Sequence, residues 1–365
     1  MFLHITYNIL VVLAIVDGSI RPAVSSLKFA VVIFRHGDRA PFFNYKLNPY
    51  TNFFPEGPYQ ITKLGKQHMF KKGQIMRRLY DGFLSNLYLD SEIYTKTTNV
   101  SRTHMSASML LTGLYPPTDY QIWSDKKTLW QPIPIYGNSP DHCDGAIGYC
   151  PAFESVLEKA YVELYNNSYM TVIDNLLPYL SKKCGQIIDR KNIFGLYDLL
   201  TCQKTFGLQL PEWLSQSNYE KIKNYVHGKH FMKVLFGNNR LQNIFAGPLM
   251  KEITSLIAEK SKANTTELRK MYLYSGHDLS LGFLANILDN ELDVFNFGGS
   301  LHFHLYHSKD TFSDIIKVFF FKQWDDDKGI ELSMSNCKPP CKVSKFAKMV
   351  NEKIPKTRKQ ECHDL

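Results

Sequence analysis

Residues 29–41 read Phe-Ala-Val-Val-Ile-Phe-Arg-His-Gly-Asp-Arg-Ala-Pro, so six apolar residues run directly into a histidine flanked by arginines. The apolar run over residues 27–34 is rich in Val and Ile. Such a run is typical of a strand that is covered on both faces, as in a parallel sheet flanked by helices. Cationic groups crowded at the end of a buried strand indicate that an anion binds there.

The rest of the chain predicts a βα alternation that is interrupted once. Residues 121–240 show helical patterns and few strand signals, which favours an inserted, mainly helical cap. We therefore expect a three-layer α/β fold, a mostly parallel sheet flanked by helices, with its core in residues 25–120 and 241–365. The expected helices are 59–80, 102–114, 151–167, 191–206, 248–263 and 278–288, and the expected further strands are 92–97, 271–275, 301–306 and 314–322.

The N-terminal residues 1–20 are predicted to be a signal peptide. The apolar stretch 8–16 is too short to span a bilayer and small residues follow it, although the region before it contains neither Lys nor Arg. A buried N-terminal strand or helix is the alternative. No later segment is apolar over a membrane-spanning length, so we expect a soluble, secreted protein without a membrane anchor.

The chain contains seven cysteines, which fits an exported protein. The short spacing of Cys337 and Cys341 favours a small disulfide loop over a metal site, and the odd total leaves one thiol over. Plausible acceptor sites for N-linked glycans occur at Asn99, Asn166 and Asn264.

The formal net charge of +9 fits anionic partners such as phosphate esters, nucleic acids or membrane surfaces. The cationic residues are scattered, however. Their densest cluster, Lys71-Lys72 with Arg77-Arg78, falls on a predicted helix, where we expect a solvated face. Nucleic acid is therefore not expected to be a main partner.

Three histidines lie in or just after the predicted strand 301–306, at positions 302, 304 and 307. A metal site is one interpretation of this cluster. The alternation of the strand places His302 and His304 on the face opposite Leu301 and Phe303, so a polar strand face is the preferred interpretation.

Three predicted strands that are far apart in the sequence end in cationic or histidine residues. The first ends at Arg35 and His36, the second leads to Arg102, and the third delivers His277 and Asp278. In a parallel sheet, ligands bind beyond the carboxyl ends of the strands. We therefore expect these side chains to meet in one crevice.

That set of side chains is suited to phosphoryl transfer. The guanidinium groups of Arg35, Arg39 and Arg102 match phosphate oxygens, and they depress the pKa of His36 so that its ring nitrogen stays free to attack phosphorus. An aspartic acid near its reference pKa of about 3.9 would protonate the leaving group in acid. No nucleophile elbow and no Walker loop is present.

The combined pattern resembles the histidine acid phosphatase family, and most closely its secreted prostatic-type and insect venom members. The resemblance is carried by residues 35–41, 59–65, 100–107, 129–134, 210–213, 274–278 and 337–341. It implies a phosphoglycerate-mutase-like core, a phosphohistidine on His36 that water later hydrolyses, proton donation by Asp278, and no metal or other cofactor. It implies that phosphate is held by Arg35, Arg39, Arg102 and His277, and it places His68, Trp130 and Trp213 near the pocket mouth.

The resemblance also pairs Cys150 with Cys362 and Cys337 with Cys341. The usual partner of Cys202 would fall near Ser300, so Cys184 becomes its expected partner, and Cys143 is then the odd thiol. The lysosomal branch of the family carries a C-terminal membrane anchor, which we do not expect here.

One segment departs from the family pattern. Relatives tend to carry two aspartates before the second phosphate-binding arginine, where this chain reads Asn99-Val100-Ser101-Arg102. The pocket should be more positive as a result. Ser101 is expected to cap the helix that begins here, and Asn99 is expected to carry no glycan because a glycan would obstruct the site.

The sequence therefore predicts a secreted acid phosphatase that acts on small phosphate monoesters, with a homodimer as its candidate assembly. A phytase or a lysophosphatidate phosphatase of the same fold is the nearest alternative. A catalytically silent secreted binding or antigenic protein is the alternative from another class. A cytosolic phosphoglycerate-mutase-like enzyme is disfavoured by the leader and the cysteines.

Overall fold

The computed structural model describes residues 19–20, 22–125, 128–137, 150–165, 169–292, 296–310 and 312–363. Most of the predicted signal peptide, Cys143 and the Asn166 acceptor site lie outside the described residues. Asn99 and Asn264 are both exposed.

One sheet of eight strands forms the centre of the described structure, in the order β1-β8-β7-β6-β2-β5-β3-β4. The pairing is parallel from β2 through β5 and β3 to β4, and antiparallel from β2 through β6, β7 and β8 to β1. The strands are β1 (Ser19–Ile20), β2 (Leu27–Arg35), β3 (Ile93–Thr97), β4 (Tyr136–Gly137), β5 (Met271–Gly276), β6 (Ser300–Ser308), β7 (Ser313–Phe321) and β8 (Gly329–Glu331).

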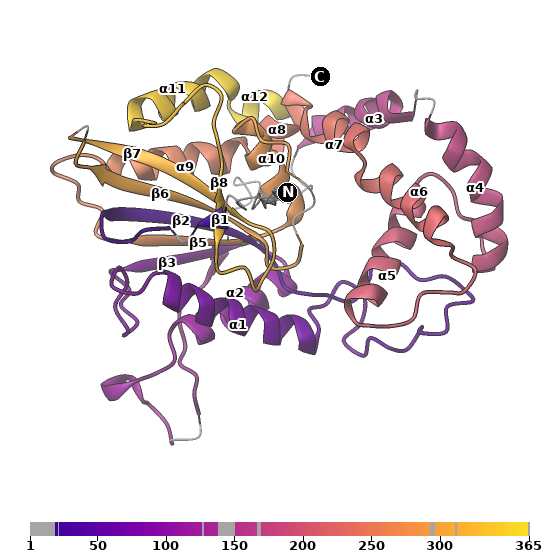
Figure 1. Cartoon of the computed structure of the whole chain (residues 1–365), viewed down its shortest axis with the longest axis horizontal. Coiled ribbons are helices and arrows are strands. Elements are labelled where there is room, and N and C mark those ends of the chain that lie inside the picture. The colour runs from indigo at the N-terminus through magenta and orange to yellow at the C-terminus, as the bar shows by residue number, and fades with distance from the viewer. Residues whose placement is uncertain are drawn as a thin grey trace, which may run out of the picture.

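Helices cover both faces of this sheet (Figure 1). They are α1 (Lys63–Leu79), α2 (Ser101–Leu114), α3 (Pro151–Tyr165), α4 (Tyr169–Cys184), α5 (Ile193–Thr205), α6 (Gln216–His227), α7 (Lys229–Phe236), α8 (Asn239–Phe245), α9 (Gly247–Lys260), α10 (Asp278–Ile287), α11 (Val343–Lys353) and α12 (Arg358–His363), with a 3₁₀ turn η1 (Asp119–Gln121). The predicted three-layer α/β class is confirmed. The sheet is mixed because β6 runs antiparallel to both of its neighbours, β2 and β7.

The alternation of β2 explains why its residues 29–34 are all apolar. Phe29, Val31 and Ile33 pack into a core with α9, α10 and α11, whereas Val32 and Phe34 pack into a second core with α1 and α2. Both faces of β2 are therefore buried over residues 29–34, as the near-continuous apolar run predicted.

The cap has its own core. A third hydrophobic cluster joins α4, α5 and α6, together with Tyr45 from the loop after β2. Within the predicted insertion 121–240, however, β4 pairs with β3 and α3 packs into the core shared with α8 and α10. The domain boundaries stay a prediction.

The starts of α1 and α2 differ in their capping. Thr62 caps α1, because its Oγ1 accepts a hydrogen bond from the Gly65 amide. Ser101 does not cap α2: the helix begins at Ser101 itself, and the Ser101 hydroxyl donates to the side chain of Gln60 instead. Arg102 still lies in the first turn.

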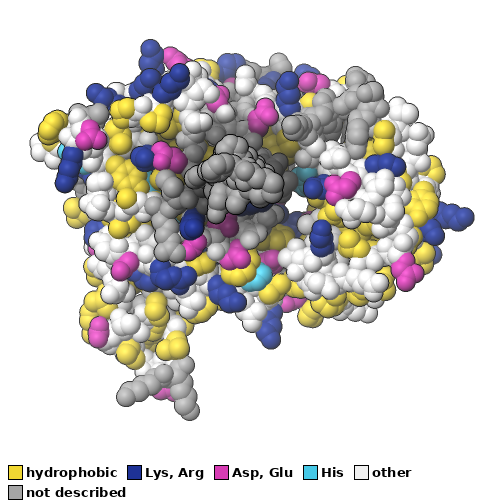
Figure 2. Space-filling view, in the orientation of Figure 1, with side chains coloured by type: hydrophobic (Ala, Val, Ile, Leu, Met, Phe, Trp, Pro, Cys, Tyr) yellow, Lys and Arg dark blue, Asp and Glu magenta, His cyan; other side chains and the backbone are white. Residues whose placement is uncertain are grey.

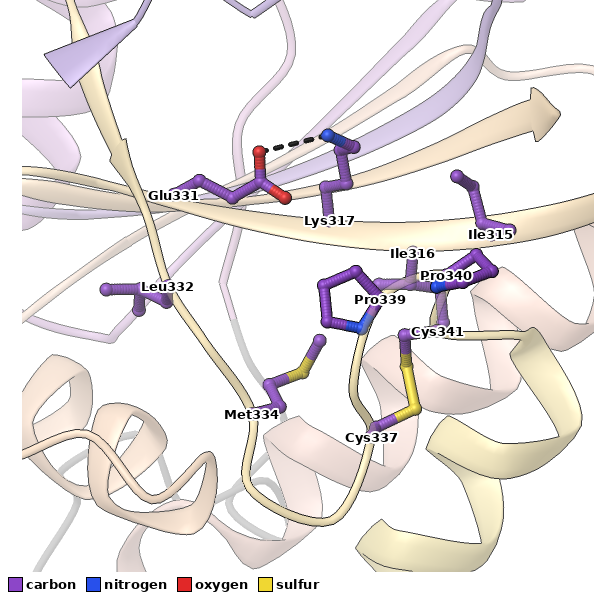
Figure 3. Close-up of a pocket in the computed structure, with 10 residues that line it drawn as sticks. All are labelled: Ile315, Ile316, Lys317, Glu331, Leu332, Met334, Cys337, Pro339, Pro340 and Cys341. Atoms are coloured by element: carbon purple, nitrogen blue, oxygen red, sulfur yellow. Dashed lines mark hydrogen bonds and ion pairs between the residues drawn. A yellow bond between two sulfur atoms is a disulfide. The ribbon is translucent and has the colours of Figure 1, made fainter. Parts of the chain in front are cut away.

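The predicted disulfides Cys150–Cys362 and Cys337–Cys341 are both present. The Cys337–Cys341 loop lines a small pocket against β7, where Lys317 and Glu331 form an ion pair of 3.0 Å (Figure 3). This pocket shares no residue with the predicted site. We draw no function from it.

The expected Cys184–Cys202 disulfide is wrong, since both thiols are free and buried. Cys184 ends α4 inside the cap cluster, whereas Cys202 of α5 directs its Sγ to the Arg39 carbonyl oxygen, 3.6 Å away. The Cys184 and Cys202 sulfur atoms therefore contact different parts of the structure.

The expectation of a solvated cationic face on α1 is wrong for Lys72. Lys72 is buried and its Nζ donates to Ser300 Oγ at 3.0 Å, while Arg77 donates to the backbone carbonyls of Leu84 and Ser85. Elsewhere the cations are dispersed: on the face in Figure 2, Lys and Arg side chains form separate groups rather than one continuous patch.

His302 and His304 do share one face of β6, but that face is buried. The Tyr80 hydroxyl lies 2.7 Å from His302 Nδ1 and 2.8 Å from His304 Nε2. His302 Nε2 contacts Ser300, and His304 Nδ1 contacts Tyr306. Hydrogen bonds therefore satisfy these imidazoles, and within the described ranges no group of three His, Cys, Asp or Glu side chains could hold a metal ion.

Candidate active site

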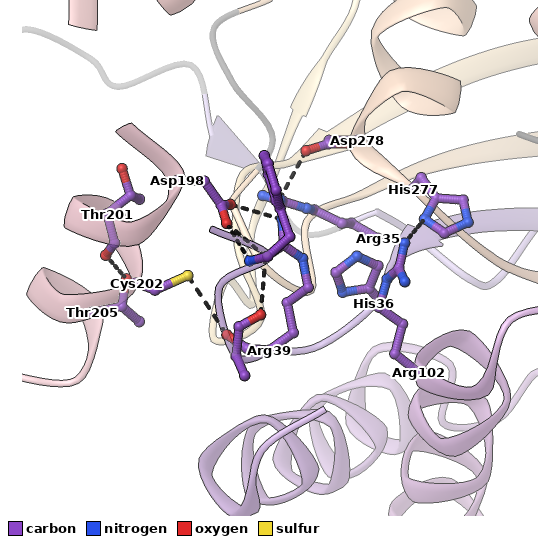
Figure 4. A network of polar contacts seen from close by, with 12 residues as sticks. Arg35, His36, Arg39, Arg102, Asp198, Thr201, Cys202, Thr205, His277 and Asp278 are labelled. Carbon is purple, nitrogen blue, oxygen red and sulfur yellow. Dashed lines mark hydrogen bonds and ion pairs between the residues drawn. The ribbon is translucent and has the colours of Figure 1, made fainter. Parts of the chain in front are cut away.

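The three strand ends predicted to converge are neighbours in the sheet. β5 lies between β2 and β3 and is parallel to both. Arg35 is in register with Gly276, and Thr97 is in register with Ser275, so the three strands end at nearly the same level. The side chains that follow these ends form the network in Figure 4.

His36 lies at the centre of this network and is buried. Its Nδ1 is 2.8 Å from the Gly37 carbonyl oxygen, which can only accept, so Nδ1 carries the hydrogen in the neutral ring and Nε2 keeps its lone pair. Burial, followed by the charges of Arg35, His277, Arg102 and Arg39, holds the pKa of His36 well below its ordinary value. The ring is therefore neutral, with an unprotonated Nε2.

Close packing against α1 fixes the loop that carries His36. A Cβ on Gly37 would lie 2.7 Å from the Gly65 carbonyl oxygen, and a Cβ on Gly65 would lie 2.1 Å from that of Asp38. Only glycines permit this approach. The Gly37 amide also donates to Ser106 of α2, so both helices of this layer hold the loop.

Arg35 is paired with the predicted proton donor. Its Nη2 lies 2.8 Å from Asp278 Oδ2, and its guanidinium carbon lies 4.2 Å from the centroid of the Phe297 ring. Asp278 occupies the first turn of α10, where its Oδ1 accepts from the Leu279 amide.

Two influences act on the Asp278 carboxyl. Burial raises its pKa, but Arg35, Arg39, His277 and the Leu279 amide outweigh burial, and the net pKa is lower than the ordinary value. The assumption of a carboxyl near its reference pKa is therefore wrong for the unliganded site. In the unliganded site the ionised form of Asp278 is therefore favoured more than in an ordinary aspartate.

Arg39 is largely occupied by the cap. Its Nη1 and Nη2 donate to the Asp198 carboxylate of α5 at 3.0 and 2.7 Å, and Nη1 also donates to the Ala40 carbonyl oxygen. Three of its five N–H groups are thus used. Arg39 can offer an anion only its remaining donors, rather than the whole fork that the sequence suggested.

Arg102 and His277 face each other across the site. Arg102 Nη2 donates to His277 Nδ1 at 3.4 Å, and His277 Nε2 contacts Thr98 Oγ1 at 3.1 Å. Burial, with Arg102 next, lowers the pKa of His277 to about 4, so this ring is neutral too. The buried Nε of Arg102 has no hydrogen-bond partner among the described residues, which leaves a donor available for an anion.

The residues predicted at the pocket mouth are dispersed. His68 stacks on Trp324 and contacts the Asp38 carboxylate at 2.7 Å, Trp130 packs against Trp123, and Trp213 packs against Tyr45 in the cap.

Asp198, Thr98 and Phe297 contact site residues and were missed from the sequence. Thr98 directly follows the end of β3, a position that could have drawn attention to it. Asp198 lies within a largely apolar, mostly buried helix and Phe297 lies in a loop, and neither carries a local signal.

Comparison with known proteins agrees with this geometry. Residues 26–320 match the histidine phosphatase superfamily (branch 2). Human lysosomal acid phosphatase is 30% identical over 92% of this chain and 80% of its own length, and human prostatic acid phosphatase is 27% identical over 92% and 88%.

Among solved structures, Hafnia alvei phytase in complex with tartrate aligns with a TM-score of 0.69 at 15% identity, over 91% of this chain and 98% of that one. A likeness at this identity speaks for the fold alone.

The fold and the family match together define a phosphomonoester hydrolase. The chain belongs to the histidine phosphatase superfamily, branch 2. No helix in the described part of the chain has the length and apolar character needed to cross a bilayer.

Proposed function

We propose that the protein is a secreted acid phosphatase that hydrolyses phosphate monoesters through a covalent phosphohistidine on His36. The observation that carries the proposal is the fixed tautomer of His36: Nδ1 is engaged by the Gly37 carbonyl oxygen, and the free Nε2 belongs to a buried, neutral ring among three arginines. Such a nitrogen is a competent nucleophile, and the arginines neutralise charge on the transferring phosphoryl group.

In the first step, His36 Nε2 attacks phosphorus, the bond to the ester oxygen breaks, and the leaving oxygen takes a proton from Asp278. In the second step, water attacks the phosphohistidine and gives a proton to Asp278, so that phosphate leaves and the free enzyme returns. Arg35, Arg39, Arg102 and His277 hold the phosphoryl oxygens. No metal or other cofactor takes part in this scheme.

The lowered pKa of Asp278 in the unliganded site is compatible with the donor role. A bound phosphate draws the Arg35 charge to itself and places negative charge beside the carboxylate. Both effects favour the protonated carboxyl, so the pKa of Asp278 rises when substrate binds. Acidic solution supplies the proton, which supports an acidic working range.

Secretion is supported by two disulfides, which are typical of exported proteins, and by the leader-like composition of the first 20 residues. Asn99 is exposed three residues before Arg102, and we propose that it carries no glycan. Mapping of intact glycopeptides tests this, and full occupancy at Asn99 would contradict it.

A panel of aryl phosphates, alkyl phosphates, lysophosphatidate and inositol hexakisphosphate at acidic and neutral pH tests the proposed activity. We expect monoester turnover in acid, a phosphoprotein trapped by acid quench, and loss of both in His36→Ala. Preference for inositol hexakisphosphate would favour the phytase alternative. Preference for lysophosphatidate would favour the lysophosphatidate phosphatase. A folded wild-type enzyme that is inactive on the whole panel would favour the silent binding protein.

A further inference from the structure

Two exposed aromatic rings border the anion site and take no part in the proposed chemistry. Phe42 is 38% exposed and Tyr59 is 47% exposed. Their rings stack with centroids 5.4 Å apart and 12° between the planes. The Arg39 guanidinium carbon lies 5.6 Å from the Phe42 centroid, and that of Arg102 lies 6.0 Å from the Tyr59 centroid. Each ring thus adjoins one of the site's arginines.

The backbone of Tyr59 is strained. Its φ of +65° lies in the left-handed region, which glycine adopts readily and a bulky side chain adopts at a cost. The surroundings hold it there, because the Ala40 amide donates to the Gln60 carbonyl oxygen and the Ser101 hydroxyl donates to the Gln60 side chain. Strain retained beside a reaction centre points to use of the side chain.

Phe42 is tied to the same framework. Its backbone amide donates to Asp198 Oδ2 at 3.2 Å, and the same carboxylate holds the Arg39 guanidinium. One group of the cap therefore sets the position of both an aromatic ring and a cation. The ring pair is a fixed surface at the edge of the site.

We propose that Phe42 and Tyr59 form a leaving-group subsite that selects phosphate esters of planar aromatic alcohols. The inference rests on the proposed function, since it assigns the substrate class of that same site. A flat ring gains an offset-stacked or edge-on contact with these rings, which a flexible alkyl group does not match. A polyanionic leaving group gains nothing from apolar rings.

The alternative is that the two rings only cover the guanidinium faces of Arg39 and Arg102. In that case their removal would disturb phosphate binding itself, and it would affect every ester alike. The two possibilities therefore differ in whether the effect depends on the leaving group.

The test compares Michaelis constants for O-phospho-L-tyrosine and glycerol 2-phosphate, together with inhibition by inorganic phosphate, in Phe42→Ala and Tyr59→Gly. Tyr59→Gly removes the ring and relieves the strained φ, so this variant is expected to fold. Tyr59→Phe keeps the ring. Phe53→Ala is the matched control, since the Phe53 ring is similarly exposed but packs on Tyr50, Phe54 and Phe206.

We expect Phe42→Ala and Tyr59→Gly to raise KM for the aryl ester roughly threefold to tenfold, with the alkyl ester and phosphate inhibition changed by less than about twofold. Tyr59→Phe and Phe53→Ala should resemble the wild type. Equal changes for both esters, or no change for either, would overturn the subsite. Wild-type enzyme that hydrolyses neither ester would instead overturn the proposed function.

Discussion

In the proposed mechanism His36 must be unprotonated and Asp278 must be protonated, and the surroundings of each residue bear on that requirement. The nucleophile must be unprotonated, and burial among cations keeps the pKa of His36 low enough for that in acid. Asp278, the proposed donor, must carry a proton. Acidic solution favours its protonated carboxyl once a bound phosphate has drawn the Arg35 guanidinium away. The unprotonated His36 and the protonated Asp278 can therefore coexist in the same acidic pH range.

Substitution of Asp278 by Asn tests the donor role at the level of one atom. We expect kcat for glycerol 2-phosphate to fall by roughly 10²- to 10⁴-fold, and kcat for 4-nitrophenyl phosphate to fall much less, because a phenolate leaves without a proton. Steady-state kinetics of the two esters at acidic pH measure the split. Equal losses for both would remove Asp278 from the acid role and leave it as the partner of Arg35.

Asp198 acts through Arg39, so its role is one of positioning. In Asp198→Asn the two-oxygen acceptor is lost and Arg39 is no longer held in one place. We expect weaker inhibition by inorganic phosphate and a KM raised by roughly tenfold, with kcat and its pH profile little changed. Asp198→Glu, which keeps the charge, should recover part of the loss. Tighter phosphate inhibition in Asp198→Asn would show that Asp198 competes with the anion.

At the scale of elements, the sequence predicted the parallel half of the sheet because its strands carry their own signals. β2 is apolar from Phe29 to Phe34, and the cationic residues at its end indicate an anion site. The convergence of Arg102 and His277 was expected because ligand-binding residues of a parallel sheet gather beyond the carboxyl ends of its strands. The partners Asp198 and Phe297 could not be predicted, because tertiary packing of the cap and of a distant loop brings them to the site.

Lys72 shows, within a single helix, that local sequence does not predict tertiary contacts. The Lys and Arg cluster on α1 reads as a solvated face, yet Lys72 points into the layer between α1 and β6. There it begins a chain of contacts that runs through Ser300, His302, Tyr80 and His304. Composition alone does not tell which cation of a helix faces the sheet.

Lys72→Met is predicted to stabilise the protein. Burial lowers the pKa of Lys72 to about 8, against the opposing influence of Asp326 and Asp325, so its charged form is disfavoured in the folded state. Methionine removes that cost, and we expect the free energy of unfolding at neutral pH to rise by about 1–3 kcal/mol. Denaturant unfolding measures it, with exposed Lys71→Met as a control that should change little.

The stability difference between Lys72→Met and the wild type should change with pH, and the pKa values of Lys72 in the folded and unfolded states fix the direction of that change. The unfolded chain keeps the Lys72 proton up to about pH 10.5, whereas the folded protein loses it near pH 8. Between these values the unfolded state binds more protons, so the wild type gains stability as pH rises and the advantage of Lys72→Met shrinks. A variant that is less stable than the wild type at every pH would contradict the argument.

At the scale of the whole molecule, the segment between α2 and β4 departs from the compact body. It extends away from the sheet as an arm, at the lower left of Figure 1. Its two sides are joined by Trp123, whose Nε1 donates to the Trp130 carbonyl oxygen at 2.7 Å. Large apolar side chains nevertheless stay exposed along it: Tyr120, Ile122, Trp123, Leu129 and Trp130.

We expect this exposed apolar arm to be an interaction surface, with a second copy of the chain as its partner. The wild type should therefore elute as a homodimer at micromolar concentration, and Leu129→Glu should yield a folded monomer, because Leu129 is 70% exposed and a charge there opposes burial. Size-exclusion chromatography with light scattering reports the mass. Ile187→Glu is the matched control: Ile187 is 79% exposed but lies between α4 and α5 of the cap, so this variant should remain dimeric. A monomeric wild type, or a dimer that survives Leu129→Glu, would exclude the arm as the interface.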